Sequence, residues 1–140
     1  MFHCVIPGPP VPQKQTRCCS QGSFFYDPSA KDKKRIQHIL RLKDHGAPLK
    51  GPVELKIEFY MPIPKSASKA DKERMASHKI LHQKRPDEDN LAYLISNALK
   101  GIVYEDDSQV CAKIVYKIYD KEPRTVINVR EIYEGYFPCD

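Results

Sequence analysis

The sequence predicts an α+β fold: a single small domain over residues 1–140, with one mixed or antiparallel sheet of about four strands and two to three helices packed against it. Two observations carry this prediction. Segments with the two-residue period of a strand and segments with the period of a helix both occur, and no internal repeat is visible. A chain of 140 residues suffices for one core and is too short for two ordinary domains.

The chain opens on a proline-rich stretch, Val5 to Pro12. Proline is excluded from helix interiors and from central strands, so we predict a short edge strand that leads into a loop. Basic and polar residues follow from Gln13 to Arg17, and Lys14 and Arg17 are candidates for contacts with a nucleic-acid backbone.

A first helix is predicted from Ala30 to Asp44, with Ser29 as its candidate N-cap and a thin apolar stripe that includes Ile36 and Leu40. The polar side of this segment carries six basic residues against two acidic ones. A solvated helix face and a phosphate-contacting face explain that excess equally well. In the second case the candidates for DNA contact are Lys31 and Lys34.

Clean alternation of apolar and polar residues from Val53 to Met61 predicts a strand with one buried face. The polar stretch that follows, to about Lys79, has too few apolar residues to bury deeply. Ser66 or Ser68 can cap it, and we expect a surface helix or a mobile loop.

A second helix is predicted from Asn90 to Lys100, because apolar residues recur at helical spacing and Gly101 follows where a helix commonly ends. Two β-branched and aromatic runs come next, Val110 to Tyr119 and Thr125 to Tyr133. A short loop joins them, which predicts an antiparallel hairpin.

Composition limits the class of protein. The 23 basic and 18 acidic residues leave a net charge of +5, which permits a polyanionic partner without requiring one. Apolar runs are too short to span a membrane, and the N-terminus lacks the pattern of a secretory signal, so we expect a cytoplasmic protein without disulfides. The five cysteines have no CxxC spacing, and thiols without a joint role explain them better than a zinc site built from His3, Cys4, Cys18 and Cys19.

Six acidic side chains gather in two short segments, residues 87–89 and 105–107. Taken singly, Asp87 and Asp89 are explained as caps of the second helix, and Asp106 and Asp107 as turn residues. Taken together they suggest a site. The second helix advances about 15 Å, and an extended return after Gly101 would bring the later segment back beside the earlier one.

Converging carboxylates repel one another unless a cation lies between them. Ligands that are all oxygen suit Mg²⁺, or Mn²⁺, better than Zn²⁺. Such an ion keeps positions open for a water molecule and a phosphate oxygen, which phosphodiester hydrolysis requires. Lys84 and Arg85, just upstream of the acidic residues, are candidates for holding a DNA backbone there, although a solvated basic turn explains them equally well in isolation.

These segments resemble the RusA family of Holliday-junction resolvases. The likeness lies in Arg85-Pro-Asp-Glu-Asp-Asn-Leu91, Asn97-Ala-Leu99 and Asp106-Asp-Ser-Gln-Val110, with similar flanks at Ile6-Pro-Gly8, Tyr26-Asp-Pro28 and Pro123-Arg-Thr125. The resemblance implies a homodimeric, bacterial or phage-encoded endodeoxyribonuclease of DNA recombination and repair. Such an enzyme uses Mg²⁺ to place paired nicks in four-way DNA junctions.

By matching motif positions, the resemblance assigns the catalytic, metal-binding roles to Asp87, Asp89 and Asp107, with Asp106 as a further candidate ligand. Two positions depart from the family pattern: Tyr93 stands where the family usually carries Lys, and Asn97 where it usually carries Asp. The principal hypothesis is therefore an active junction resolvase. The alternatives are a junction-binding protein with weak or lost cleavage, and an ordinary nucleic-acid-binding domain without a metal.

Overall fold

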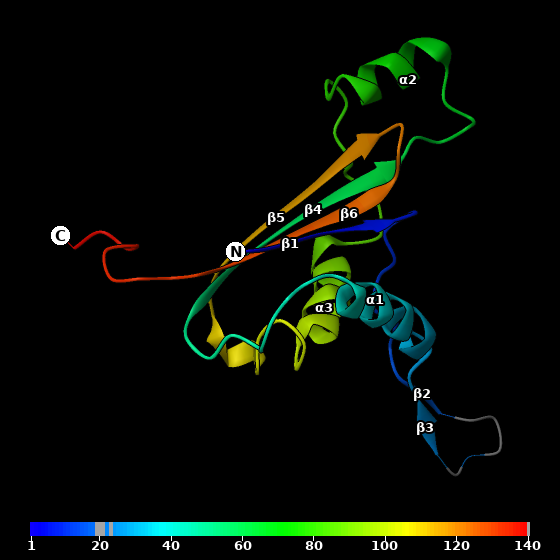
Figure 1. The fold of residues 1–140 in the computed structure, drawn as a ribbon. Helices are drawn as coiled ribbons and strands as arrows, with labels where there is room; N and C mark the ends of the chain where they lie inside the picture. The colour runs from blue at the N-terminus through cyan, green and yellow to red at the C-terminus, as the bar shows by residue number, and fades with distance from the viewer. Residues whose placement is uncertain (19–21, 23, 140) are drawn as a thin grey trace.

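The structure, a computed structural model, describes residues 1–18, 22 and 24–139. Its main sheet has four strands in the order β1 (Phe2–Pro7), β6 (Arg124–Glu131), β4 (Val53–Pro62) and β5 (Val110–Asp120). Figure 1 shows the helices α1 (Ala30–Leu42) and α3 (Glu88–Leu99) together on one side of this sheet, and α2 (Lys69–Ala76) beyond one end of it. The predicted α+β class and the four-stranded mixed sheet are confirmed.

Two short elements complete the described part of the chain. Strands β2 (Arg17–Cys18) and β3 (Phe25–Tyr26) pair antiparallel as a separate two-stranded ribbon. In Figure 1 this ribbon projects away from the sheet and helices, and we call the described residues of this part of the chain, 17–18, 22 and 24–26, the arm. A single turn of 3₁₀ helix, η1 (Asp107–Gln109), precedes β5.

The pairing of the last two strands differs from the predicted hairpin, which is wrong. Strand β4 lies between them, parallel to β5 and antiparallel to β6. The loop at 121–123 can pass over β4, because strands separated by one neighbour are about 10 Å apart and extended residues advance about 3.3 Å each. Strands β6 and β4 are the two inner strands, and the side chains that they turn toward the core, such as Leu55, Ile57, Ile127 and Val129, are fully buried.

The core lies between the sheet and the two helices. Helix α3 contributes six buried residues, whereas α1 contributes Ile36 and Leu40, as its thin apolar stripe predicts. The opposite face of the sheet carries Lys56, Glu58 and Tyr60 of β4, and among the described residues no helix packs on it. We call it the helix-free face.

Most predicted elements are present with shifted ends. Strand β1 begins at Phe2 instead of Val5, because Phe2, Cys4 and Ile6 alternate into the core. The polar stretch after β4 contains α2, and the Ser68 hydroxyl caps it by accepting a 3.1 Å hydrogen bond from the Asp71 amide. The search of the described helices for one both long and apolar enough to cross a membrane finds none.

Candidate active site

Asp87 occupies the N-cap position of α3. Its backbone is extended, its side chain is exposed, and among the described atoms its carboxylate makes no capping hydrogen bond. An N-cap aspartate normally accepts a hydrogen bond from the first turn of its helix. Capping therefore does not account for the Asp87 carboxylate, which is left free at the positive end of the α3 dipole.

Glu88 and Asp89 form a pair of carboxyl groups in the first turn of α3. Their side chains lie within hydrogen-bonding distance, and this contact, together with desolvation and the charge of Asp89, raises the pKa of Glu88. Two carboxyl groups so close favour a shared proton or a cation between them. The start of α3 thus holds three adjacent carboxyl groups, of which two already interact.

Asp106 has a structural role at the other end of this region. Its carboxylate caps η1, accepting hydrogen bonds from the Ser108 amide at 3.1 Å and the Ser108 hydroxyl at 2.6 Å. It also pairs with the Lys100 ammonium at 3.1 Å. The Ser108 bonds, followed by Lys100, lower the pKa of Asp106 to about 2. The capping explanation therefore holds for Asp106.

Asp107 is exposed at the start of η1. Burial and the charge of Asp107 raise the pKa of Tyr104, and the Tyr104 hydroxyl donates a 3.1 Å hydrogen bond to the carbonyl of Ser96 in the last turn of α3. These contacts put Asp107 alongside the C-terminal half of α3. Asp87 and Asp89 are at the opposite end of that helix.

The expected convergence of three carboxylates is not seen. In the described ranges, no three His, Cys, Asp or Glu residues come close enough to hold one ion. The reason lies in the return path from α3, which is not extended throughout. Residues 101–104 form a tight turn, in which the Gly101 amide donates to the Tyr104 carbonyl at 2.7 Å, so less chain remains for the return.

Two lysines of β5 supply positive charge beside the start of α3. The Lys117 ammonium donates hydrogen bonds to the carbonyls of Lys84 at 2.7 Å and Pro86 at 2.9 Å, directly before Asp87. The Asp89 carboxyl group and burial raise the pKa of Glu88, and the charges of Lys113 and Lys117 lower it by a smaller amount. Sequence reasoning missed both lysines. The structure identifies them by their inward register, opposite the buried Leu55 and Phe59 of β4, which the sequence does not reveal.

The loop after β1 joins the starts of α1 and α3. The Gln13 amide donates to the Asn90 carbonyl at 2.9 Å, and the Lys14 amide donates to the Ser29 hydroxyl at 2.8 Å. Ser29 thus holds this loop instead of capping α1 through its side chain. A surface depression adjoins the loop; its lining residues are Pro12, Gln13, Arg85, Pro86, Asp87 and Asn90.

The predicted DNA-contacting residues are distributed around these elements. Lys84 and Arg85 precede Asp87 and are exposed, as are Lys31 and Lys34 on α1. Lys14 is exposed beside the start of α1, and the side chain of Arg17 is outside the described residues.

Of the two residues that depart from the family pattern, Tyr93 is 56% exposed on α3, one turn beyond Asp89. Asn97 is half-buried near the end of the same helix. Neither position provides a cation, and the nearby Lys100 is paired with Asp106. The helix itself therefore brings no positive side chain to the carboxylates.

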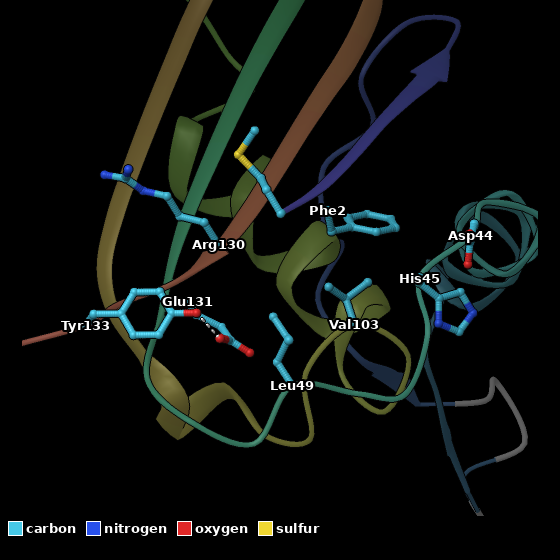
Figure 2. Close-up of a pocket in the computed structure, with 9 residues that line it drawn as sticks. Phe2, Asp44, His45, Leu49, Val103, Arg130, Glu131 and Tyr133 are labelled. Carbon is cyan, nitrogen blue, oxygen red and sulfur yellow. Dashed lines mark hydrogen bonds between the residues drawn. The ribbon is translucent and has the colours of Figure 1, made fainter.

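A second, larger pocket adjoins the second acidic segment through Leu49 and Val103, but none of the six carboxylates lines it. Figure 2 shows it beside β1 and β6, where the Tyr133 hydroxyl donates a 2.5 Å hydrogen bond to Glu131. Its lining residues are Met1, Phe2, Asp44, His45, Leu49, Val103, Arg130, Glu131 and Tyr133.

The described cysteines do not gather. Cys4 is buried on the core side of β1, and desolvation raises the pKa of its thiol, whereas Cys18, Cys111 and Cys139 are exposed and free. His3 is on the opposite side of β1 from Cys4, and its Nδ1 atom is 2.7 Å from the Asn128 side-chain oxygen. Cys19 lies outside the described residues.

The fold is α+β, and its mixed sheet brings lysines of one strand beside carboxylates at the start of a helix. This arrangement is suited to metal-assisted chemistry on phosphates. The chain matches the family Endodeoxyribonuclease RusA over residues 7–130. It is also similar to the "Uncharacterized protein YqaN" of Bacillus subtilis (strain 168), with 33% identity over 131 residues, which covers 89% of this chain and 92% of the relative. The chain belongs to the RusA family of endodeoxyribonucleases, and that membership supports a nuclease.

Proposed function

We propose that the protein is a Mg²⁺-dependent, structure-selective endodeoxyribonuclease that resolves four-way DNA junctions by paired symmetric nicks, in DNA recombination and repair. The observation that carries this proposal is the free Asp87 carboxylate beside the Glu88 and Asp89 pair, inside a family match that spans both acidic segments. A DNA substrate would put the enzyme in the cytoplasm of a bacterium, encoded by the host or by a phage.

The donor set fits a hard divalent ion. Asp87, Asp89 and Asp107 offer oxygen ligands only, which suits Mg²⁺ and also Mn²⁺. Asp106 is omitted from the proposed ligands because its oxygens are engaged by Ser108 and Lys100. When bound, the ion would supply an activated water and offset charge on the phosphate. Asp87 and Asp89 would hold it at the start of α3. Asp107 is kept as a proposed ligand on the resemblance alone, since in this structure it lies toward the other end of that helix.

A binding face for DNA is supported by the basic side chains around this site. Lys14, Lys31, Lys34, Lys84 and Arg85 are exposed, and a negatively charged backbone that reaches Asp87 needs such cations to offset carboxylate repulsion. Arg17 belongs to the same proposal.

Selectivity for branched DNA is supported by the arm. Phe24, Phe25 and Tyr26 are consecutive exposed aromatic residues, Phe25 being 75% exposed. Phe25 and Tyr26 form β3, and Figure 1 shows β3 in the ribbon that projects from the body. Exposed aromatic side chains provide stacking surfaces for bases. The branch point of a junction interrupts the continuous stack of base pairs and can present base faces there, whereas the interior of a linear duplex does not.

Homodimerisation follows from the need for two symmetric cuts and is supported by the helix-free face. Val5, Ile114 and Tyr116 are exposed there, on β1 and β5. Exposed apolar side chains on a sheet face are typical of surfaces that associate, and self-association with twofold symmetry would pair two identical sites.

A second candidate function, junction binding with weak or lost cleavage, is favoured by Tyr93. A cation that contacts a reacting phosphate is worth a factor of about 100 or more in rate in comparable sites, and Tyr93 cannot supply it. The two candidates share the fold and the DNA-binding face, so a cleavage assay separates them.

The deciding experiment incubates the protein with a labelled four-way junction and a matched linear duplex, in Mg²⁺, in Mn²⁺ and in chelator. We expect metal-dependent paired nicks on the junction alone. Asp87→Asn should abolish them while junction binding stays equal or improves, because a charge that repels phosphate is removed. Asp44→Asn, which removes an exposed carboxylate after α1, is the matched control and should cleave normally. Junction binding without cleavage in either metal would favour the second candidate.

A further inference from the structure

Helix α3 carries the acidic half of the candidate site and no cation of its own. Its twelve residues, Glu88–Leu99, include neither Lys nor Arg. The next residue, Lys100, is paired with Asp106 at 3.1 Å, at the far end of the helix from Asp87. Since a phosphate must approach several carboxylates, positive charge has to reach the start of α3 from another element.

Besides the loop with Lys84 and Arg85, strand β5 reaches it. Lys113 and Lys117 alternate with the outward residues of β5 and lie opposite the buried Leu55 and Phe59 of β4, so both face the helix side of the sheet. They occur four residues apart, which is about 13 Å along a strand. The contacts of the two ammonium groups differ, so the two lysines are expected to have different tasks.

Lys117 is the anchored member of the pair. Its ammonium donates to the carbonyls of Lys84 and Pro86, at 2.7 and 2.9 Å, and its side chain is half-buried. An ammonium has three donors, so two of the three are used to hold the segment that leads into Asp87. Lys113 is exposed, and in the described chain it has no ion-pair partner within 4 Å.

We propose that β5 provides the cationic half of the site: Lys113 contacts a phosphate of the bound DNA, and Lys117 is a positioning residue that fixes residues 84–87 and with them the Asp87 carboxylate. This inference rests on the proposed function. It assigns to β5 the charge that Tyr93 does not supply from α3. The alternative is that both lysines are ordinary solvated or structural residues.

The first test concerns Lys113. Lys113→Met should lower the single-turnover cleavage rate about 100-fold and reduce the salt dependence of junction binding, measured in chelator, by about one phosphate contact. Mn²⁺ binding, followed by electron paramagnetic resonance without DNA, should be unchanged. Adding Tyr93→Lys to Lys113→Met should restore most of the cleavage rate. Lys50→Met, at an exposed lysine in the loop before β4, is the matched control and should behave as wild type.

The second test concerns Lys117. Lys117→Met should weaken Mn²⁺ binding about tenfold and lower cleavage, while junction affinity in chelator stays within twofold of wild type. Lys117→Arg should recover much of the Mn²⁺ affinity, because a guanidinium also donates to two carbonyls. Circular dichroism identifies any variant that fails to fold, and Lys117→Arg then serves as the test variant.

Some outcomes would overturn the inference. Wild-type cleavage and salt dependence in Lys113→Met would remove Lys113 from the phosphate contact. Unchanged Mn²⁺ affinity in Lys117→Met would reduce Lys117 to a structural residue. If the wild-type protein cleaves no DNA, the proposed nuclease activity is wrong. The two lysine roles can still be decided in that case, because Mn²⁺ binding and the salt dependence of junction binding are measured without cleavage.

Discussion

Two aspartates at helix starts show how the same residue type acquires different tasks. The Asp106 carboxylate accepts hydrogen bonds from Ser108 and pairs with Lys100. The Asp87 carboxylate, at the N-cap of α3, makes no capping hydrogen bond in the described structure. The sequence alone cannot separate them, because both precede a helical turn and both fit a cap. The distinguishing fact is the serine two residues after Asp106, where Asp87 has Asp89.

The first residue-scale prediction concerns metal binding by the carboxyl pair. At ten times its dissociation constant, a bound ion adds about 1.4 kcal/mol of stability, or roughly 3 to 6 °C in melting temperature for a chain of this size. We expect Mg²⁺ to produce such a rise in the wild-type protein. Asp89→Asn should remove most of it in thermal unfolding, whereas Asp44→Asn should keep it. An equal rise in both variants would exclude Asp89 as a ligand.

The second residue-scale prediction concerns pH. The pKa of Asp106 is about 2 in the folded protein, against an ordinary value near 4 in the unfolded chain. As pH falls below about 4 the unfolded chain takes up the proton first, so the contribution of Asp106 to stability, present above that pH, is lost toward pH 2. Urea unfolding of wild type and Asp106→Asn should show a stability difference at pH 6 that narrows by pH 3. A constant difference would contradict this role.

At the scale of elements, local patterns predicted what each segment is but not what it pairs with. Strand β4 and helix α3 were found because each buries one regular face, a property written in consecutive residues. The hairpin was wrong because the position of β4 between β5 and β6 depends on residues 48 or more places away in sequence. Likewise, the turn at 101–104 prevented the extended return that would have joined Asp107 to Asp89.

The candidate site was predicted in part for a related reason. Its acidic half lies in two short motifs, each of which can be recognised from consecutive residues of the sequence. Its cationic half, Lys113 and Lys117, becomes visible only when β5 is set beside the loop at 84–86. A lysine in an alternating strand is ordinarily assigned to solvent, so only the register of β5 against β4 shows that these two face the helices.

The element-scale prediction concerns the arm. Stacking of one base on an aromatic side chain contributes about 1 to 3 kcal/mol, so Phe25→Ala should weaken junction binding by about tenfold while duplex binding changes little. Fluorescence anisotropy with both DNAs measures the two affinities. Phe137→Ala, which removes an exposed aromatic ring near the C-terminus, is the control. Equal loss on both DNAs would exclude a branch-specific role for Phe25.

At the scale of the whole molecule, the sheet has two unlike faces. Helices α1 and α3 cover one face, and no helix of the described residues covers the other, which all four strands form (Figure 1). Exposed Val5, Ile114 and Tyr116 on that second face stand next to charged residues such as Lys56 and Glu58, a mixture suited to reversible association.

The molecule-scale prediction follows from that asymmetry. We expect the wild-type protein to sediment as a dimer and Ile114→Lys to sediment as a monomer, since a buried, unpaired charge opposes association. The monomer should still bind DNA but lose the coupling between paired nicks. Leu42→Lys, at an exposed leucine that ends α1, is the control and should stay dimeric. A dimeric Ile114→Lys would direct attention to another surface.

All six carboxylates of the acidic segments lie in the single connection that leads from β4 to β5, together with Lys84 and Arg85. Lys14, the arm and α1, which provide the other candidates for DNA contact predicted from the sequence, lie before β4. The residues proposed for catalysis and those proposed for substrate choice are therefore in separate, consecutive segments of the chain. A genetic exchange with a breakpoint just before β4 could give the protein a different arm while its carboxylates are inherited intact, so the two properties are free to evolve at different rates.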